Sequence, residues 1–245
     1  MNKKVHHIAA RMGLLLHGNK IWISEITSVF FIAFILLLLV ASTFLLFVKE
    51  YKIHKNEKKI SVLKANEWTA QKTLDQLVAK ERISAAIKSE LGINIAEPAY
   101  YQLVNLVYEN SKTFGYDPLL VLAVIRVESV FNPQAKGRYK NSDLSGALGL
   151  MQIKPETAME IAAFLKIPVK TNADLMRPEI NMAIGVAYLT KLISSFKSFK
   201  LGLLAYNQGP SAIKEYLNGN QQLSIDYYNK VLRRYYILKK HVDKR

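Results

Sequence analysis

Cysteine is absent from the sequence, and histidine is rare. Without cysteine the chain can form no disulfide bond, no thiolate metal site and no cysteine nucleophile. All five histidines lie before residue 55 or after residue 240. A histidine-based catalytic triad or a histidine-rich metal site is therefore not expected in the long stretch between them.

Acidic residues are in the minority, with 19 against 34 basic residues and a formal net charge of +15. Such a chain suits a polyanion, which could be nucleic acid, an anionic membrane surface or an anionic cell-wall polymer. The charge is spread along the chain, and there is no basic recognition helix or RNA-binding fingerprint. We therefore expect a solvated basic surface and no nucleic-acid partner.

Charge is missing altogether from residues 26–48, ITSVFFIAFILLLLVASTFLLFV. At about 1.5 Å per residue, a helix of this length covers the roughly 30 Å of a bilayer core. The apolar region of a cleaved signal peptide is shorter, at about 7–15 residues. We predict a single transmembrane helix over residues 26–48, preceded by a cytoplasmic segment of residues 1–25.

The sequence also lacks any sustained two-residue alternation of apolar side chains, so the expected fold class is mainly α. In residues 49–96 the apolar positions recur at spacings of three and four, which predicts a helical stalk. A short coiled coil is possible there, but its heptads break at Glu67 and Glu81. Residues 97–245 then form a helical domain, with helices expected at 100–113, 118–131, from 155, 180–196, 199–206, 210–218 and 224–240.

One acidic residue is out of place in the helix expected over residues 118–131, which is otherwise apolar nearly all round. Glu128 shares its face with Ile125 and Phe131, while Arg126 points elsewhere. Burial without a partner raises the pKa of a carboxyl group, and the negative end of a helix acts in the same direction. Such a group can serve as a general acid. The alternative is a structural glutamate that pairs with a distant lysine or arginine.

Several short motifs follow Glu128 in a fixed order. They are Glu128-Ser129-x-Phe131-Asn132-Pro133-x-Ala135, Gly146-Ala147-x-Gly149-Leu150-Met151-Gln152-Ile153, Pro178, Asn181, Gly185, Tyr188-Leu189, Ala205-Tyr206-Asn207-x-Gly209-Pro210 and Tyr227. Together they closely resemble the Slt-type lytic transglycosylases, relatives of goose-type lysozyme, over about residues 97–240.

The resemblance implies a lysozyme-like helical catalytic domain that cleaves the β-1,4 bond between N-acetylmuramic acid and N-acetylglucosamine in peptidoglycan. It implies that Glu128 is the catalytic acid and base, and that no metal or cofactor is needed. The substrate-binding residues that it implies are Ser129, Met151, Gln152, Tyr206, Asn207 and Tyr227.

The sequence departs from the family pattern at two places. The family joins Ala135 to Gly146 by a short link that contains a serine, whereas here residues 136–145 form a longer, basic and polar insertion. Either Ser142 or Ser145 could replace the usual serine. Gln208 stands where the family often has alanine, a change that we expect to be tolerated.

Most glycosidases use two carboxylates, but these motifs supply only Glu128. The family's chemistry is substrate-assisted: the N-acetyl group stabilises the cationic centre, and the C6 hydroxyl then closes a 1,6-anhydro ring. One alternative is a lysozyme-like hydrolase with Asp143 as second carboxylate. Another is a non-catalytic scaffolding module of the cell envelope, and either an enzyme or a scaffold could have a partner in a secretion assembly.

The function that the resemblance implies places residues 49–245 on the periplasmic side of the inner membrane. The charges that flank residues 26–48 favour the opposite orientation under the positive-inside rule. Arg11 and Lys20 precede this segment, whereas a group of five lysines follows it: Lys49, Lys52, Lys55, Lys58 and Lys59. We expect the periplasmic orientation, against this bias.

Overall fold

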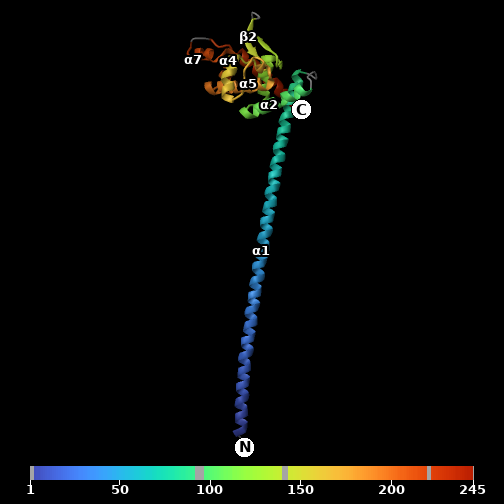
Figure 1. Ribbon diagram of the computed structural model, residues 1–245, viewed down its shortest axis with the longest axis vertical. Coiled ribbons are helices and arrows are strands. Elements are labelled where there is room, and N and C mark those ends of the chain that lie inside the picture. Colours follow the sequence, from blue (N-terminus) through green and yellow to red (C-terminus); the bar gives the residue numbers. More distant parts are fainter. Residues whose placement is uncertain (1–2, 92–96, 140–142, 220–221, 245) are drawn as a thin grey trace. The chain divides into compact units, whose positions relative to one another are not determined.

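The computed structural model describes residues 3–91, 97–139, 143–219 and 222–244, and the side chains of these ranges from residue 27 onward. The chain divides into two compact units, Met1–Lys72 and Thr73–Arg245. The long helix α1 (Lys3–Leu91) makes up the described part of the first unit, and its last turns belong to the second (Figure 1).

Helix α1 runs without interruption through residues 19–91, which contain neither glycine nor proline, the two residues that most disfavour a helix. The side chains from Val29 to Phe47 are exposed, and the helix is long and apolar enough there to cross a bilayer. Further along, Ile53, Ile60 and Leu63 are also exposed, so the coiled coil stays a prediction.

The second unit is mainly helical, as predicted. Its helices are α2 (Glu97–Phe114), α3 (Pro118–Ser129), α4 (Pro155–Leu165), the short 3-10 helix η1 (Asp174–Met176), α5 (Pro178–Phe196), α6 (Phe199–Gln208), α7 (Pro210–Leu217) and α8 (Asp226–Val242). Four of them, α3, α4, α5 and α7, begin with proline at the first helical position, where its missing N–H costs nothing.

Helix α3 is the most deeply buried element of this unit, because every side chain from Leu119 to Ile125 lies in the core. It packs against α2 and α8, while α5 packs against α2, α4 and α6. Asp117 caps the start of α3 by accepting a hydrogen bond from the Leu119 amide. The helix ends at Ser129 rather than at residue 131 as predicted, because Val130 and Phe131 both adopt left-handed backbone conformations.

The last turns of α1 belong to the core of the second unit. Ile83 and Ile87 are fully buried there, and the Tyr100 hydroxyl in α2 donates a hydrogen bond to the Ser84 carbonyl oxygen at 3.0 Å. These residues fall within the segment predicted as stalk. The predicted boundary at residue 97 stays a prediction, but the compact unit already begins at Thr73.

The described residues of the predicted insertion at residues 136–145 include strand β1 (Lys136–Arg138) and the first two residues of strand β2 (Leu144–Leu148). Strand β1 pairs antiparallel with β2, and Lys136 lies opposite Leu148. Ser145 lies in β2, whereas Ser142 lies outside the described residues. This small sheet is the only one in the described part of the chain, which agrees with the expectation that no large sheet forms.

Candidate active site

Glu128 lies in the last turn of α3, at the point where the chain reverses direction. The reversal is made by Val130 and Phe131, whose φ angles are 55° and 62°. Such angles are uncommon for residues other than glycine and are unfavourable for a β-branched residue such as Val130. Phe131 is buried, so its packing in the core holds this conformation. Glu128 is thereby left at the edge of the core, beside a cavity.

Two cavities meet at Glu128. The larger has a volume of about 730 Å³ and is lined by residues of α3, the β-hairpin, α4, α5, α6 and the start of α7. The smaller has a volume of about 410 Å³ and lies toward the start of α8. Glu128, Asn207 and Gln208 line both cavities. A chain-like ligand that passes from one cavity to the other would therefore cross the Glu128 carboxyl group.

The Glu128 side chain is half-buried, and its surroundings keep its carboxyl group largely out of water. Burial raises the pKa of Glu128 from 4.5 to about 7, although the hydrogen bond from Tyr227 acts in the opposite direction. The Tyr227 hydroxyl donates this bond to Oε1 of Glu128 at 2.5 Å. A substantial fraction of this carboxyl group is therefore protonated near pH 7.

Two further tyrosines belong to the wall of the larger cavity. The ring centroids of Tyr188 and Tyr206 are 5.5 Å apart, and both residues line the larger cavity. The Tyr206 hydroxyl donates a hydrogen bond to the Met151 carbonyl oxygen at 2.7 Å. Burial first, and then the Glu128 charge, raise the pKa of Tyr206 well above 10. Tyr206 therefore stays a neutral hydroxyl, which can donate and accept hydrogen bonds.

The turn before α4 that lines the larger cavity is organised by Gln152, whose φ angle is 51°. Its side-chain amide donates hydrogen bonds to the carbonyl oxygens of Gly149 at 2.8 Å and Ala135 at 3.1 Å. The second bond joins the turn to the residue before β1. Gln152 therefore fixes the cavity wall and the base of the hairpin together.

Asn181, which is fully buried in α5, holds the same turn from behind. Its Oδ1 accepts a hydrogen bond from the Met151 amide at 2.7 Å, and its Nδ2 donates to the carbonyl oxygens of Leu148 and Leu175, both at 2.8 Å. The turn approaches so closely that a Cβ atom added to Gly149 would lie 2.4 Å from Asn181 Nδ2. Glycine is therefore required at position 149.

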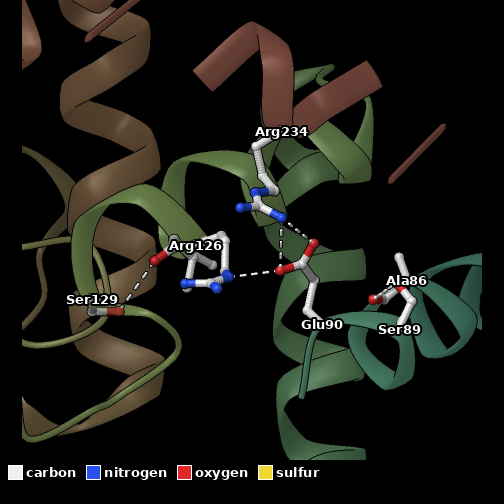
Figure 2. Close-up of polar contacts among 7 residues, drawn as sticks. Ala86, Ser89, Glu90, Arg126, Ser129 and Arg234 are labelled. Carbon is white, nitrogen blue, oxygen red and sulfur yellow. Dashed lines mark hydrogen bonds and ion pairs between the residues drawn. The ribbon is translucent and has the colours of Figure 1, made fainter. Parts of the chain in front are cut away.

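An ion network links α3 to α1 and α8. Figure 2 shows the Glu90 carboxylate, in the last turn of α1, between the guanidinium groups of Arg126 in α3 and Arg234 in α8. Arg126 Nε lies 2.6 Å from Glu90 Oε2, and Arg234 Nη1 lies 3.0 Å from Glu90 Oε1. Arg126 therefore pairs with Glu90 and is not the partner of Glu128, as its helical position predicts.

The structure brings most of the residues predicted for the site together. Glu128, Ser129, Gln152, Tyr206 and Asn207 line the larger cavity, and Tyr227 lines the smaller. Ser129 Oγ donates to the Ile125 carbonyl oxygen in its own helix.

Met151 is the exception among the predicted residues. Its side chain is fully buried near Gly185 and lines neither cavity. Met151 therefore contributes through its backbone, which holds Tyr206 and is held by Asn181.

Several residues at the site were not among the predictions for it. Tyr188 appeared only as a motif position, and it lines the larger cavity from α5. The candidate second carboxylate Asp143 lines neither cavity, whereas Glu156 lines the larger and Asp226 the smaller. In the described part of the chain, no three histidine or carboxylate side chains come together as a metal site would require.

A carboxylic acid with a raised pKa, set in a cleft with tyrosine and amide side chains, is a group of the kind that can serve as a general acid. The sequence model of the Transglycosylase SLT domain matches residues 105–229, which is more than half of the chain. The chain therefore belongs to this family.

Curated relatives are similar over the same region. The soluble lytic murein transglycosylase of Salmonella typhimurium is 36% identical over 148 residues, which are 59% of this chain and 22% of the relative. The membrane-bound lytic murein transglycosylase E of Buchnera aphidicola is 33% identical over 144 residues, which are 54% of this chain and 63% of the relative. The chain spans about a quarter or less of the soluble relatives that it matches.

Among solved structures, the 70 kDa soluble lytic transglycosylase of Escherichia coli is similar to 56% of this chain, at 25% identity and a TM-score of 0.48. The match covers 24% of that protein.

Proposed function

We propose that this chain is a membrane-anchored lytic transglycosylase that cleaves the β-1,4 bond between N-acetylmuramic acid and N-acetylglucosamine in peptidoglycan. The observation that carries the proposal is the carboxyl group of Glu128, which has a pKa of about 7 and lies where two cavities meet. Family membership and the names of the relatives support the choice of glycan substrate.

In the proposed reaction, Glu128 gives its proton to the glycosidic oxygen as the bond from that oxygen to C1 breaks. The N-acetyl oxygen of the muramic residue stabilises the positive charge at C1. The Glu128 carboxylate then takes the proton of the C6 hydroxyl, and O6 bonds to C1 to form a 1,6-anhydro ring. The reaction consumes no water, and Glu128 ends protonated, as it began.

The proposed binding residues fit this reaction by their chemistry. Gln152, Asn207 and Tyr206 offer amide and hydroxyl groups that can hydrogen-bond to sugar hydroxyls and N-acetyl groups. Tyr227 would stabilise the carboxylate that forms when Glu128 loses its proton, because its hydroxyl already donates to Oε1. Met151 would act only by positioning Tyr206 through its carbonyl oxygen.

Analysis of the product tests the proposal directly. The full chain in detergent should release muropeptides that end in 1,6-anhydro-muramic acid from purified peptidoglycan. These are lighter by one water than hydrolytic products and have no end that borohydride can reduce. Dominance of reducible ends would instead show a lysozyme-like hydrolase. Glu156→Gln and Asp226→Asn would then be the variants to make, because these carboxylates line the cavities and Asp143 does not.

We also propose that residues 26–48 anchor the chain in the inner membrane with residues 49–245 on the periplasmic side. The exposed apolar stretch of α1 and the membrane-bound relatives support anchoring, and the location of peptidoglycan supports the orientation. The lysines after residue 48 argue against that orientation. A reporter that is active only after export, fused after Arg245, should be active. A silent export reporter beside an active cytoplasmic one would refute the orientation.

A further inference from the structure

The side chain of Gln208 joins two segments that line the smaller cavity. Gln208 is the last residue of α6, and its side-chain amide donates a hydrogen bond of 2.8 Å to the Ser224 carbonyl oxygen. Ser224 lies two residues before the first residue of α8, in the segment that leads into this helix. The bond therefore ties the end of α6 to the entry of α8.

Ser224 in turn holds the first residue of α8. Its hydroxyl accepts a hydrogen bond from the Asp226 amide at 3.3 Å and donates one to Asp226 Oδ2 at 3.0 Å. It thereby satisfies one of the amide groups that a helix leaves unpaired at its start. The next residue is Tyr227, whose hydroxyl donates to Oε1 of Glu128 at 2.5 Å. A continuous series of contacts therefore leads from the end of α6 to the acid.

Packing also steadies the first turn of α8. Tyr227 is buried, and the ring of Tyr228 meets that of Phe199 in α6 edge to face, with 6.4 Å between the centroids. The ion pair of Arg234 with Glu90 lies about two turns further along the helix. These contacts keep α8 in place without the link from α6. Loss of that link should therefore loosen the position of the tyrosine hydroxyl and leave the unit folded.

We propose that Gln208 is a positioning residue, which holds the Tyr227 hydroxyl against Glu128 through the segment before α8. This inference rests on the proposed function, because it concerns the proton that the acid gives to the substrate. Position 208 is one of the places where the sequence departs from the family pattern, and alanine there would have no amide to donate. Without the link, the hydrogen bond to the carboxylate should be made for less of the time. The pKa of Glu128 should then rise, since this bond lowers it.

Other ionisable groups share the two cavities with the acid, and a useful variant leaves them unchanged. The charged side chains are Lys136, Arg138, Lys154, Glu156, Asp226 and Lys230. The tyrosines of the larger cavity are Tyr139, Tyr188 and Tyr206. Gln208→Met adds no charge and keeps the length of the side chain, but it has no group to donate a hydrogen bond. Asp226 is the charged group that the variant would also disturb, because Ser224 binds it.

The test therefore places Gln208→Met in the wild-type chain and in the Tyr227→Phe background, each as the full chain in detergent. In the wild-type background, the alkaline limb of kcat/KM against pH should move upward by about half a pH unit, toward the low end for one hydrogen bond. The ratio of the rate at pH 8 to the rate at pH 6 should then rise about two- to threefold. In the Tyr227→Phe background the substitution should cause no further shift, because the contact that it controls is already lost.

Asn110→Leu is the matched control for this variant. The Asn110 side-chain amide donates a bond of the same length, 2.8 Å, to the Leu106 carbonyl oxygen in α2, and Asn110 lines neither cavity. The control removes an equivalent hydrogen bond and should leave the alkaline limb in place. A control that moves the limb as far as Gln208→Met would show that any loss of stability has this effect, and would overturn the inference.

Titration of the Glu128 carboxyl group by carbon-13 NMR separates the inference from the proposed function, because it needs no activity. Glutamate-labelled chain supplies the signal, which the Glu128→Gln variant assigns by its absence. A wild-type chain that cleaves no peptidoglycan would refute the proposed function, and the titration would still test the link. A pKa that does not rise in Gln208→Met, or that rises equally in both backgrounds, would overturn the role of Gln208. A higher KM with an unmoved pH limb would show that Gln208 binds the substrate itself, and would overturn that role as well.

Discussion

The hydroxyl group of Tyr227 donates a hydrogen bond to Oε1 of Glu128, although 99 residues separate the two in the sequence. Packing of α8 against α3 brings them together. Burial, and then the Glu128 charge, raise the pKa of Tyr227 well above 10, so this hydroxyl remains a donor throughout the working range. Its bond stabilises the charged form of Glu128, whereas burial stabilises the neutral form.

Tyr227→Phe should therefore raise the pKa of Glu128 further, because it removes the effect that lowers this pKa and leaves the burial. An acid with a higher pKa stays protonated to a higher pH. The alkaline limb of the profile of kcat/KM against pH should move upward, and the ratio of the rate at pH 8 to the rate at pH 6 should increase. A limb that stays in place or moves to lower pH would show that the hydrogen bond does not control this proton.

Glu128→Gln should lower the rate of peptidoglycan cleavage by at least about a hundredfold, the low end for loss of general acid–base catalysis. The amide keeps the shape of the side chain but can neither give nor recover a proton. Release of soluble muropeptides over time measures the loss. Glu156→Gln, a carboxylate of the same cavity, is the control and should keep most of the activity. Unchanged activity of the Glu128 variant would refute the proposed role.

The Glu128→Gln variant should be more stable than the wild-type chain at alkaline pH. Folding raises the pKa of Glu128 from 4.5 to about 7. The stabilisation that the folded chain gains from binding this proton is therefore complete below pH 4.5 and is lost as the pH rises through 7. The loss amounts to up to about 3 kcal/mol. Urea unfolding at pH 5 and pH 8.5 should show that the free energy of unfolding of the variant, relative to that of the wild-type chain, increases by this order between the two pH values. Near-ultraviolet tyrosine signals suit the measurement, because both tryptophans, Trp22 and Trp68, lie in the first unit.

Local rules predicted much of the fold and the acid itself. Proline at the start of a helix predicted α3 and α4, and the acidic residue in an apolar helix singled out Glu128. The contact with Tyr227 lay beyond such rules, because no local pattern relates residues 99 positions apart. It was expected only through the family resemblance.

The core position of Ile83 and Ile87 was missed for a different physical reason. Apolar spacing of three to four predicts a helix with an apolar face, but it does not say what covers that face. The exposed Ile60 and the buried Ile83 therefore give the same signal in the sequence. The hairpin was seen as a basic insertion, but its strands are too short for a two-residue alternation to be recognised.

Glu90→Gln should destabilise the second unit by about 3 kcal/mol, the low end for a broken buried ion pair, because it leaves two arginines without their shared carboxylate. The Glu90 side chain is only 5% exposed, and the arginines are 26% and 32% exposed, so water replaces the lost contact poorly. Urea unfolding of the full chain in detergent measures the change. The rate of cleavage should fall together with the stability, because Arg126 lies in the same helix as the acid, only two residues before it.

Glu179→Gln is the matched control for this variant. It breaks an exposed ion pair with Arg177, where the two side chains are 58% and 37% exposed, and should cost less than about 1 kcal/mol. Equal costs for the two variants would show that the Glu90 network behaves as a surface ion pair and does not hold α3.

A fragment that begins at Thr73 should fold and should show a cooperative urea-unfolding transition at 25 °C. A fragment that begins at Glu97 should show no such transition, because it should not be stably folded. The shorter fragment lacks Ile83 and Ile87, which are fully buried in the second unit. Loss of a buried isoleucine side chain costs about 2–5 kcal/mol, and a domain of this size is stable by only about 5–15 kcal/mol. The shorter fragment also lacks Glu90, so Arg126 and Arg234 lose their partner.

Single substitutions in the full chain separate the loss of packing from other effects of truncation. Ile83→Ala and Ile87→Ala should each destabilise the second unit by at least about 2 kcal/mol, because each leaves a cavity in the core. Leu77→Ala is the control: the same helix carries it, but it is 60% exposed, and a surface substitution usually changes stability by less than about 0.5 kcal/mol. If the fragment from Glu97 proves as stable as the fragment from Thr73, the end of α1 is a stalk and not part of the folded domain, and the boundary lies at residue 97.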